Sequence, residues 1–357
     1  MQDWSPRVRA SYRSIGSPFL TAARRVIPSA SIKRAYALAA TPLELPIIAF
    51  GQAQMETPDG FQVDPQGGAS YAIGIQAPPG TAGMMPVIGL QYRSGAGNGL
   101  VGNSWGIRGL NAITRCGRTI DRDGVSSGVH FDSTDKFCMD GSVLIVVNGG
   151  AYGGAGTEYR TDNDNFTRVI SYGGTLANGP DLFVAHKKSG QFIEFGNTVD
   201  SRVEAQGKAV IRLWAVNKVA DRAGNYMSVT YFEDNANGDH RPARIDYTGN
   251  TTTGLAPYNS VRFVYQARAD ISPSYVSGSS ISNQQRLSNI QTFAGAALVK
   301  DYRLTYDCGG IGATSRLLNL AECDAAGTCL PPTSFAWQGS TGAPGYAAAV
   351  NWLSPAS

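Results

Sequence analysis

Residues 60–115 decide the fold of this chain, and they read GFQVDPQGGASYAIGIQAPPGTAGMMPVIGLQYRSGAGNGLVGNSWGIRGLNAITR. Apolar and polar residues alternate over short runs, and each run ends at Gly, Pro or Asn. The run Ile88–Tyr92, for example, is soon followed by the glycine-rich Ser94–Gly99. This pattern is typical of strands joined by tight turns. The stretch has no His, no pair of Cys and no cluster of acids, so it predicts a framework rather than a reaction site.

The composition of the whole chain favours the same fold class. Charged residues make up 16% of the 357 residues, against about 25% in an average globular protein. The chain also contains 43 Gly, 16 Tyr and 13 Phe. Abundant turn residues together with many aromatic residues favour an all-β protein over a helical one. A chain of this length can bury a substantial core in one large or two ordinary domains.

The formal net charge of +3 is unevenly distributed. Residues 1–50 hold seven Arg or Lys and two acids, so the remainder of the chain carries a small negative net charge. Because nucleic-acid-binding domains usually carry a basic patch or stripe, the composition of the main body gives no support to nucleic-acid binding.

Residues 1–54 are predicted to be a basic leader or a degenerate signal segment. Basic residues run to Arg34, and Glu44 and two prolines interrupt the apolar segment that follows. These interruptions favour a leader, or a start codon placed too early, over a secretory signal cleaved near Ala53. No apolar run reaches the length of about 18 residues needed for a membrane-spanning helix, so none is predicted.

Residues 55–340 are predicted to form one all-β domain of hairpin-built, mostly antiparallel, curved sheets. The segment Leu287–Ala297 fits either a helix or a strand, and residues 341–357, rich in Gly, Ala and Pro, are expected to start a further region. Two hairpins are predicted: Leu182–His186 with Gln191–Phe195 across the turn Lys187–Gly190, and Ile211–Val219 with Tyr226–Phe232 across Asp221–Asn225. Further strands are predicted at Val143–Val147, Arg244–Tyr247, Val261–Tyr265, Val299–Tyr306 and Ser334–Trp337.

The ordered succession of motifs in residues 55–340 resembles the N-terminal domain of the virulence-plasmid B (SpvB) family. That domain also opens the B components of Tc toxins and many Rhs/YD-repeat proteins. The motifs that carry the resemblance include Gly68–Tyr71, Pro78–Gly80, Tyr92–Gly95, Gly97–Gly99 with Gly102, Trp105, Ile113–Arg115, Asp135–Gly141, Asp221–Asn225, Ile245–Gly249 and Cys329–Thr333 before Phe335 and Trp337.

The resemblance implies a structural function. It predicts a non-catalytic segment of the shell that Tc-toxin B components and Rhs proteins wrap around a toxic polypeptide, associated with virulence and exported from the cell. The implied partners are the remainder of the shell polypeptide and the C-type and A-type Tc components, and no cofactor is implied. The family's ADP-ribosylation of actin belongs to a separate C-terminal domain that needs an E-x-E motif. No two of the seven Glu in this chain are two residues apart.

The five cysteines are predicted to be disulfides or buried thiols rather than metal ligands. Cys323–Cys329 is a short loop that a disulfide can close, and Cys116 and Cys138 can bridge two neighbouring strands. A zinc site favours Cys or His in close pairs, whereas His130, His186 and His240 each stand alone. Formation of the disulfides would imply an oxidising compartment and would leave Cys308 over.

Two patterns typical of enzyme sites, one catalytic and one cofactor-binding, overlap near residue 100. Gly102–Gly106 matches the nucleophile elbow G-x-S-x-G around Ser104, and Gly97–Gly102 matches the dinucleotide-binding pattern G-x-G-x-x-G. Both sites need a following helix, and the Gly-rich continuation does not favour one. Gly97, Gly99 and Gly102 are therefore predicted to be structural residues of a hairpin turn and a bulge.

Two further site types have some support. Asp162–Asn165 and Asp234–Asp239 faintly resemble calcium loops but lack the full ligand spacing, so they are interpreted as turns in which short polar side chains cap the backbone. Trp105, Trp214 and Trp337 are predicted mainly to pack across strands, with Trp105 as a structural residue. The alternative function is a secreted carbohydrate- or surface-binding β module that uses these aromatic residues.

Overall fold

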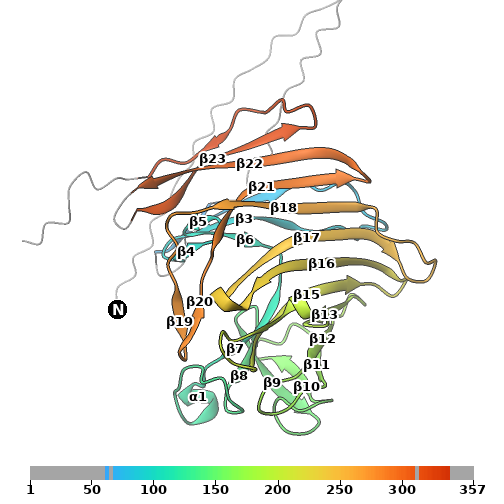
Figure 1. Cartoon of the computed structure of the whole chain (residues 1–357). Coiled ribbons are helices and arrows are strands. Elements are labelled where there is room, and N and C mark those ends of the chain that lie inside the picture. Colours follow the sequence, from blue (N-terminus) through green and yellow to red (C-terminus); the bar gives the residue numbers. More distant parts are fainter. Residues whose placement is uncertain (1–60, 64–66, 310–312, 338–357) are drawn as a thin grey trace, which may run out of the picture. The chain divides into compact units, whose positions relative to one another are not determined.

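The computed structural model of the chain describes residues 61–63, 67–309 and 313–337 (Figure 1). The predicted leader and the predicted tail lie outside these ranges. Within the described residues, strands follow one another with few interruptions and pair in antiparallel sheets. The predicted all-β fold class of hairpin-built sheets is confirmed. No helix among the described residues is long and apolar enough to cross a membrane.

The N-terminal sheet is built from the stretch that the sequence singled out. Its strand order is β1-β2-β3-β6, and Tyr71, Tyr92 and Trp105 lie opposite one another across β2, β3 and β6. A short hairpin joins β3 to β6. The bounds are β1 Gln62–Val63, β2 Ala69–Ile75, β3 Ile88–Arg93, β4 Asn98–Gly99, β5 Gly102–Asn103 and β6 Trp105–Arg108.

The next strands form a closed ring. Each strand from β7 to β12 pairs with the next one, and both β7 and β13 pair with β15, which closes the ring within the described part of the chain. The short β14, Arg202–Glu204, pairs beside it on β15. The bounds are β7 Ala112–Cys116, β8 Lys136–Met139, β9 Ser142–Asn148, β10 Glu158–Thr161, β11 Arg168–Tyr172, β12 Leu182–His186, β13 Phe192–Phe195 and β15 Ile211–Ala220.

From β15 the sheet continues as a curved, open layer that ends at β24 (Figure 1). A side hairpin of β19 and β20 extends from it. The bounds are β16 Asn225–Asp234, β17 Asp239–Asn250, β18 Asn259–Ala267, β19 Ser274–Val276, β20 Ser279–Ile281, β21 Gln285–Ala294, β22 Ala297–Gly309, β23 Thr314–Asp324 and β24 Thr333–Ser334.

The two predicted hairpins are confirmed as β12–β13 and β15–β16. Leu287–Ala297, left open between helix and strand, is largely strand, because its backbone pairs in antiparallel register with β18 on one side and β22 on the other. The strand predicted at Ser334–Trp337 was wrong in extent: only Thr333–Ser334 pairs in register with β23. The sequence also missed α1, Ile120–Asp123, and the 3-10 turn η1, Val199–Ser201, whereas the 3-10 turn η2, Asn235–Asn237, lies within the turn predicted at Asp234–Asp239.

The core of the closed ring is aromatic. Trp214 of β15 is fully buried, meets Phe137 and Phe183 edge-on, and donates from its indole N–H to the carbonyl oxygen of Pro180 over 2.9 Å. Arg115 packs over Trp214 and forms a buried ion pair with Asp135 at 3.2 Å. A buried guanidinium is tolerated because carbonyl oxygens of the surrounding loops accept its remaining protons.

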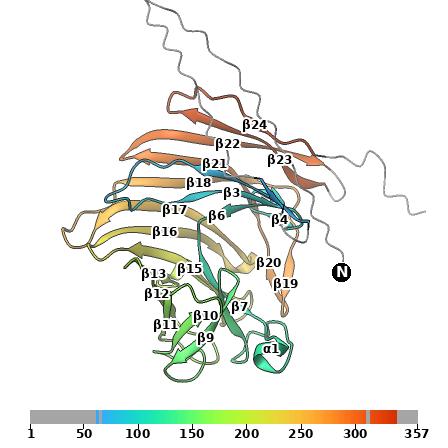
Figure 2. The ribbon, with the colours of Figure 1, turned by 180° about the vertical axis from the view of Figure 1, so that it is seen from behind.

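The N-terminal sheet packs on one face of the open sheet, as the view from behind shows (Figure 2). Leu90 and Trp105 join the same buried cluster as Phe263 and Leu304 of the open sheet. Hydrogen bonds cross between the two layers from Tyr247 Oη to the Pro78 carbonyl, from Gln76 N–H to Tyr302 Oη, and from Leu287 N–H to the Leu100 carbonyl. Residues far apart in sequence therefore form one core.

A buried carboxylate links the two layers at the hairpin of β4 and β5. The side chain of Asp270 is 3% exposed and accepts hydrogen bonds from Arg268, from Asn98 and from the backbone and hydroxyl of Ser315. Arg268 also donates to the carbonyl oxygen of Gly99. Burial alone would raise the pKa of Asp270, but these donors hold it well below its usual range.

Replacing this carboxylate tests the link. We expect Asp270→Asn to lower the free energy of unfolding by about 3–5 kcal/mol, because it leaves the Arg268 charge buried without a counter-ion. The control Asp246→Asn, at the half-exposed pair with Arg244, is expected to cost about 0–1 kcal/mol. Urea unfolding curves measure both, and equal losses would contradict the prediction.

The lowered pKa of Asp270 also predicts how the stability of the protein changes in acid. A carboxylate whose pKa is lower in the folded state stabilises the protein above its unfolded value of about 3.9, and the stabilisation disappears as the pH falls below that value. We therefore expect the difference in unfolding midpoint between wild type and Asp270→Asn to shrink below about pH 4. A difference that stays constant between neutral pH and strong acid would contradict this assignment.

Candidate functional site

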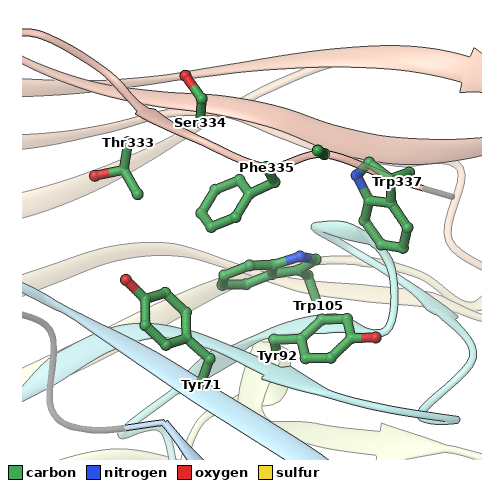
Figure 3. Close-up of a pocket in the computed structure, with 8 residues that line it drawn as sticks. Tyr71, Tyr92, Trp105, Thr333, Ser334, Phe335 and Trp337 are labelled. Atoms are coloured by element: carbon green, nitrogen blue, oxygen red, sulfur yellow. The ribbon is translucent and has the colours of Figure 1, made fainter.

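The candidate site is a cavity of about 400 Å³ between the N-terminal sheet and the segment that follows β23 (Figure 3). One wall comes from β2, β3 and β6, and the other from β24 and the residues after it. None of the lining residues is charged. The lining residues are Tyr71, Tyr92, Trp105, Thr333, Ser334, Phe335, Ala336 and Trp337.

Strand register gathers the first wall. Tyr71 is the partner of Tyr92, and Tyr92 is the partner of Trp105. Residues directly opposite each other in neighbouring strands project from the same face of a sheet, so the three rings form a row. Local alternation in the sequence therefore suffices to create this half of the site.

The second wall is held against the edge of β23. The backbone N–H of Phe335 donates to the Leu318 carbonyl, and the indole N–H of Trp337 donates to the Leu317 carbonyl over 2.7 Å. Phe335 then lies 4.8 Å from Trp105 between ring centroids, at an angle of 59°. Trp337 lies 6.2 Å from Tyr92. The rings thus pack tilted or edge-on, as aromatic pairs prefer.

The structure brings together only part of the predicted aromatic set. Trp105 and Trp337 share the cavity, whereas Trp214 is buried inside the closed ring. The sequence interpretation did not single out Tyr71, Tyr92 and Phe335 as cavity residues. The alternating pattern of β2 and β3 would have placed the two tyrosines on one face, but no sequence signal places Phe335 opposite them.

The predicted structural glycines surround the β4–β5 hairpin. Gly97 and Gly102 have φ values of +79° and +87°, a region that favours glycine. A Cβ on Gly102 would come within 2.6 Å of the Ser315 carbonyl oxygen, and one on Gly99 would lie 3.0 Å from the Trp105 carbonyl oxygen. Close backbone approach therefore requires glycine at residue 102.

Ser104 does not have the geometry of a nucleophile elbow. It has a φ of +63°, but the strand β6 follows it where that motif needs a helix. Its side chain is buried, and Oγ lies 3.5 Å from Asn103 Oδ1. The same missing helix leaves the G-x-G-x-x-G pattern of Gly97–Gly102 as a hairpin.

Two disulfides join four of the five cysteines. Cys116 of β7 is joined to Cys138 of β8, and Cys323 is joined to Cys329 across the loop after β23. Cys308 is an exposed free thiol. Among the described residues, no group of three or more His, Cys, Asp or Glu is arranged to hold a metal ion.

The two Asx-rich loops cap their own backbone. Asp164 accepts from the Phe166 N–H, and Asp162 accepts from the Asn163 N–H and pairs with Arg122. Asp234 accepts from the backbone and side chain of Asn237. Oxygens already engaged in this way fit ordinary turns.

Comparison with known families decides where the chain belongs. Residues 63–266 match the family model of the Salmonella virulence plasmid 65kDa B protein, SpvB. The chain belongs to the SpvB family. This match covers the N-terminal sheet, the closed ring and the first strands of the open sheet.

The curated SpvB relatives are longer than the shared region. The mono(ADP-ribosyl)transferase SpvB of Salmonella typhimurium strain 14028s is 25% identical over 209 residues, which cover 53% of this chain and 33% of that protein. The mono(ADP-ribosyl)transferase SpvB of Salmonella dublin matches at the same identity over 32% of its length. The alignment with this chain therefore spans about a third of the curated SpvB proteins.

Solved structures share the fold of this SpvB-family chain. The crystal structure of TcdB2-TccC3 superposes with a TM-score of 0.63 at 20% identity, over 78% of this chain and 17% of that one. The Tc holotoxin pore of Photorhabdus luminescens gives a TM-score of 0.64 at 19% identity, over 78% and 16%. The N-terminal domain of SpvB from Salmonella typhimurium gives 0.56 at 21% identity, over 71% of this chain and 98% of that domain.

A second group of polar residues lies near the start of β15, and it includes no residue of the cavity. Burial, and after it the negative charge of Glu204, raises the pKa of Glu233 to about 7, against the opposing charge of Arg212. Burial lowers the pKa of His240, the cross-strand partner of Glu233, to about 4. Glu233 Oε1 is buried without a hydrogen-bond partner in the described structure. This group therefore contains a buried carboxylate oxygen whose hydrogen-bonding capacity is not met.

Glu233 predicts a stability gain on mild acidification. A carboxyl whose pKa is higher in the folded state destabilises the protein as the pH rises from its unfolded value of about 4.3 to the folded value of about 7. We expect Glu233→Gln to raise the melting temperature at pH 8 but to change it little at pH 5. The control Glu322→Gln, at the ion pair with Lys300, should not show this pattern. An equal effect of Glu233→Gln at both pH values would refute the assignment.

Proposed function

We propose that this chain is a non-catalytic structural segment of a Tc-toxin B/Rhs-type shell that encloses a toxic polypeptide and helps to deliver it. The observation that carries the proposal is the fold likeness to TcdB2-TccC3 over 78% of this chain. That likeness is accompanied by a hairpin-built sheet whose last strand among the described residues is the short β24. Both features suit a wall that continues into further strands.

The physical argument rests on strand edges. Hairpins that pair edge to edge build a wall whose backbone groups are satisfied by the neighbouring strand. A single exposed edge is a hazard because it recruits other chains. Within the described residues, the outer edge of β24 has no strand partner. A continuing shell would cover that edge and would exclude solvent from an unfolded cargo inside.

The proposal includes the partners and the location. The partners are the remainder of the shell polypeptide and, through it, C-type and A-type Tc components, and the assembled protein acts outside the producing cell. The division into a leader at 1–54, a β domain at 55–340 and the start of a further region at 341–357 belongs to the same proposal. The disulfides Cys116–Cys138 and Cys323–Cys329 suit an oxidising compartment.

The proposal assigns no reaction to this segment. The sequence lacks the E-x-E spacing that the transferase activity of the family needs. Ser104 precedes a strand, and the aromatic cavity is lined by uncharged residues. The alternative function, a carbohydrate- or surface-binding β module, keeps one supporting observation, which is that aromatic cavity.

Strand addition at β24 gives a direct test. Ala336 lies two residues after β24, in the segment held against β23; because the Phe335 N–H donates inward to the Leu318 carbonyl, alternation of the extended backbone directs the N–H of Ala336 outward. Ala336→Pro removes that outward donor, whereas the control Ala336→Val keeps the donor and adds similar bulk. We expect the wild-type chain to co-purify with the polypeptide encoded immediately downstream, Ala336→Val to behave alike, and Ala336→Pro to lose most of the complex.

Size-exclusion chromatography with light scattering, and protease protection of a co-expressed cargo, measure the assembly. A wild-type chain that stays a stable monomer beside its downstream polypeptide, and protects no cargo, would overturn the shell function. If Ala336→Pro and Ala336→Val formed equal amounts of complex, the contact would have to lie at another edge, and the role given to the β24 edge would be wrong.

A further inference from the structure

The indole N–H of Trp105 is a hydrogen-bond donor at the aromatic cavity. Trp105 is 4% exposed, yet its indole N–H has no hydrogen-bond partner among the described residues. The other two tryptophans of the described chain, Trp214 and Trp337, donate to backbone carbonyls over 2.9 and 2.7 Å. The Trp105 nitrogen is not among the fully enclosed polar atoms that lack a partner in the described residues, so it is accessible from the cavity, and a ligand can supply the acceptor that it lacks.

The indole N–H of Trp105 faces the cavity. Figure 3 shows the nitrogen of Trp105 on the edge of the ring that faces Phe335 and Trp337. The hydroxyls of Tyr71 and Tyr92 also line the cavity without a hydrogen-bond partner in the described structure. Burial raises the pKa of Tyr71, so its hydroxyl stays protonated and can donate at neutral pH. Figure 3 shows the two tyrosine hydroxyls on opposite sides of Trp105, so the indole N–H is the donor at the centre of the aromatic cavity.

The lining narrows the class of ligand. A phosphate or carboxylate ligand would need an Arg or Lys, and none lines the cavity. A quaternary ammonium ion suits a cage of aromatic faces, but here the indole N–H presents the positive end of its dipole, which repels a cation. A volume of about 400 Å³ lies within the usual range for small-molecule sites. The ligand is therefore neutral, compact and rich in acceptor oxygens, with an apolar face.

We propose that this cavity binds one neutral sugar ring of a glycan. The apolar face of the sugar ring packs on the half-buried Phe335, and a sugar oxygen accepts the hydrogen bond of the Trp105 indole, whose own ring is almost fully covered. The hydroxyl of Tyr92, on one side of Trp105, exchanges a hydrogen bond with another sugar hydroxyl. The site goes beyond the shell function and does not depend on it, because all its residues lie within this chain.

The two walls come from opposite ends of the described chain, so a bound sugar would hold them together. Tyr71, Tyr92 and Trp105 belong to the N-terminal sheet, and Phe335 and Trp337 belong to the segment after β24. A ligand that binds only the folded arrangement stabilises it by mass action. Sugar binding is thus expected to raise the melting temperature of the chain.

The test uses the full chain and methyl glycosides of glucose, galactose, mannose and N-acetylglucosamine. Saturation-transfer NMR detects contact, and titration of tryptophan fluorescence gives affinity. We expect at least one glycoside to bind with a dissociation constant of about 1 mM. Trp105→Phe removes the N–H but keeps an aromatic ring, and it should weaken binding about 10-fold, the effect of one hydrogen bond. Tyr92→Phe should weaken binding less.

The control is Tyr275→Phe, an exposed tyrosine on β19 outside the cavity, which should bind as wild type does. Circular dichroism and melting curves check that each variant folds, and Tyr92→Phe carries the test if Trp105→Phe does not fold. The proposal is overturned if no glycoside binds at about 50 mM, or if the cavity variants bind as tightly as Tyr275→Phe. Binding of tetramethylammonium or of an aromatic peptide, without any sugar, would also overturn it. These outcomes are independent of the co-purification experiment, so failure of the sugar site can be told apart from failure of the shell function.

Discussion

The double pairing of β15 is the constraint on which the rest of the fold depends. Trp214 lies between Arg202 of β14 and Ile113 of β7, and four residues later Lys218 lies between Glu194 of β13 and Ser228 of β16. One strand thus closes the ring with its neighbours and also starts the open sheet. Because every backbone group along it needs a partner, shifting its register would break both parts at once.

Packing between layers then determines where chemistry can occur. The N-terminal sheet is held on the open sheet by a shared apolar core and by the buried Arg268–Asp270 pair at the β4–β5 hairpin. As a result, Tyr71, Tyr92 and Trp105 lie opposite the segment Phe335–Trp337 that follows β24. The aromatic cavity is therefore a product of layer packing.

A wall segment and a sugar site are compatible in one molecule. The wall needs paired edges and a dry core, which the antiparallel strands and the ring interior provide. The cavity lies beside β24, where the described sheet ends, so a ligand there would sit next to the edge at which a shell would continue. The fold comparison speaks to the wall, whereas the cavity rests on the residues of this chain alone.

The sequence by itself determined the local structure. Alternation and turn residues predicted the strands and hairpins, from the β12–β13 pair to the Gly97–Gly102 turn, because period-two patterning and glycine conformation are properties of neighbouring residues. It left Leu287–Ala297 open and grouped Trp214 with Trp105, since neither a cross-strand partner nor a layer contact is written locally. Only the tertiary structure separated the buried Trp214 from the cavity residues and brought Phe335 to Trp105, 230 positions earlier in the chain. The positions of these aromatic side chains follow from long-range packing and strand register, because both depend on contacts between segments that no local pattern encodes.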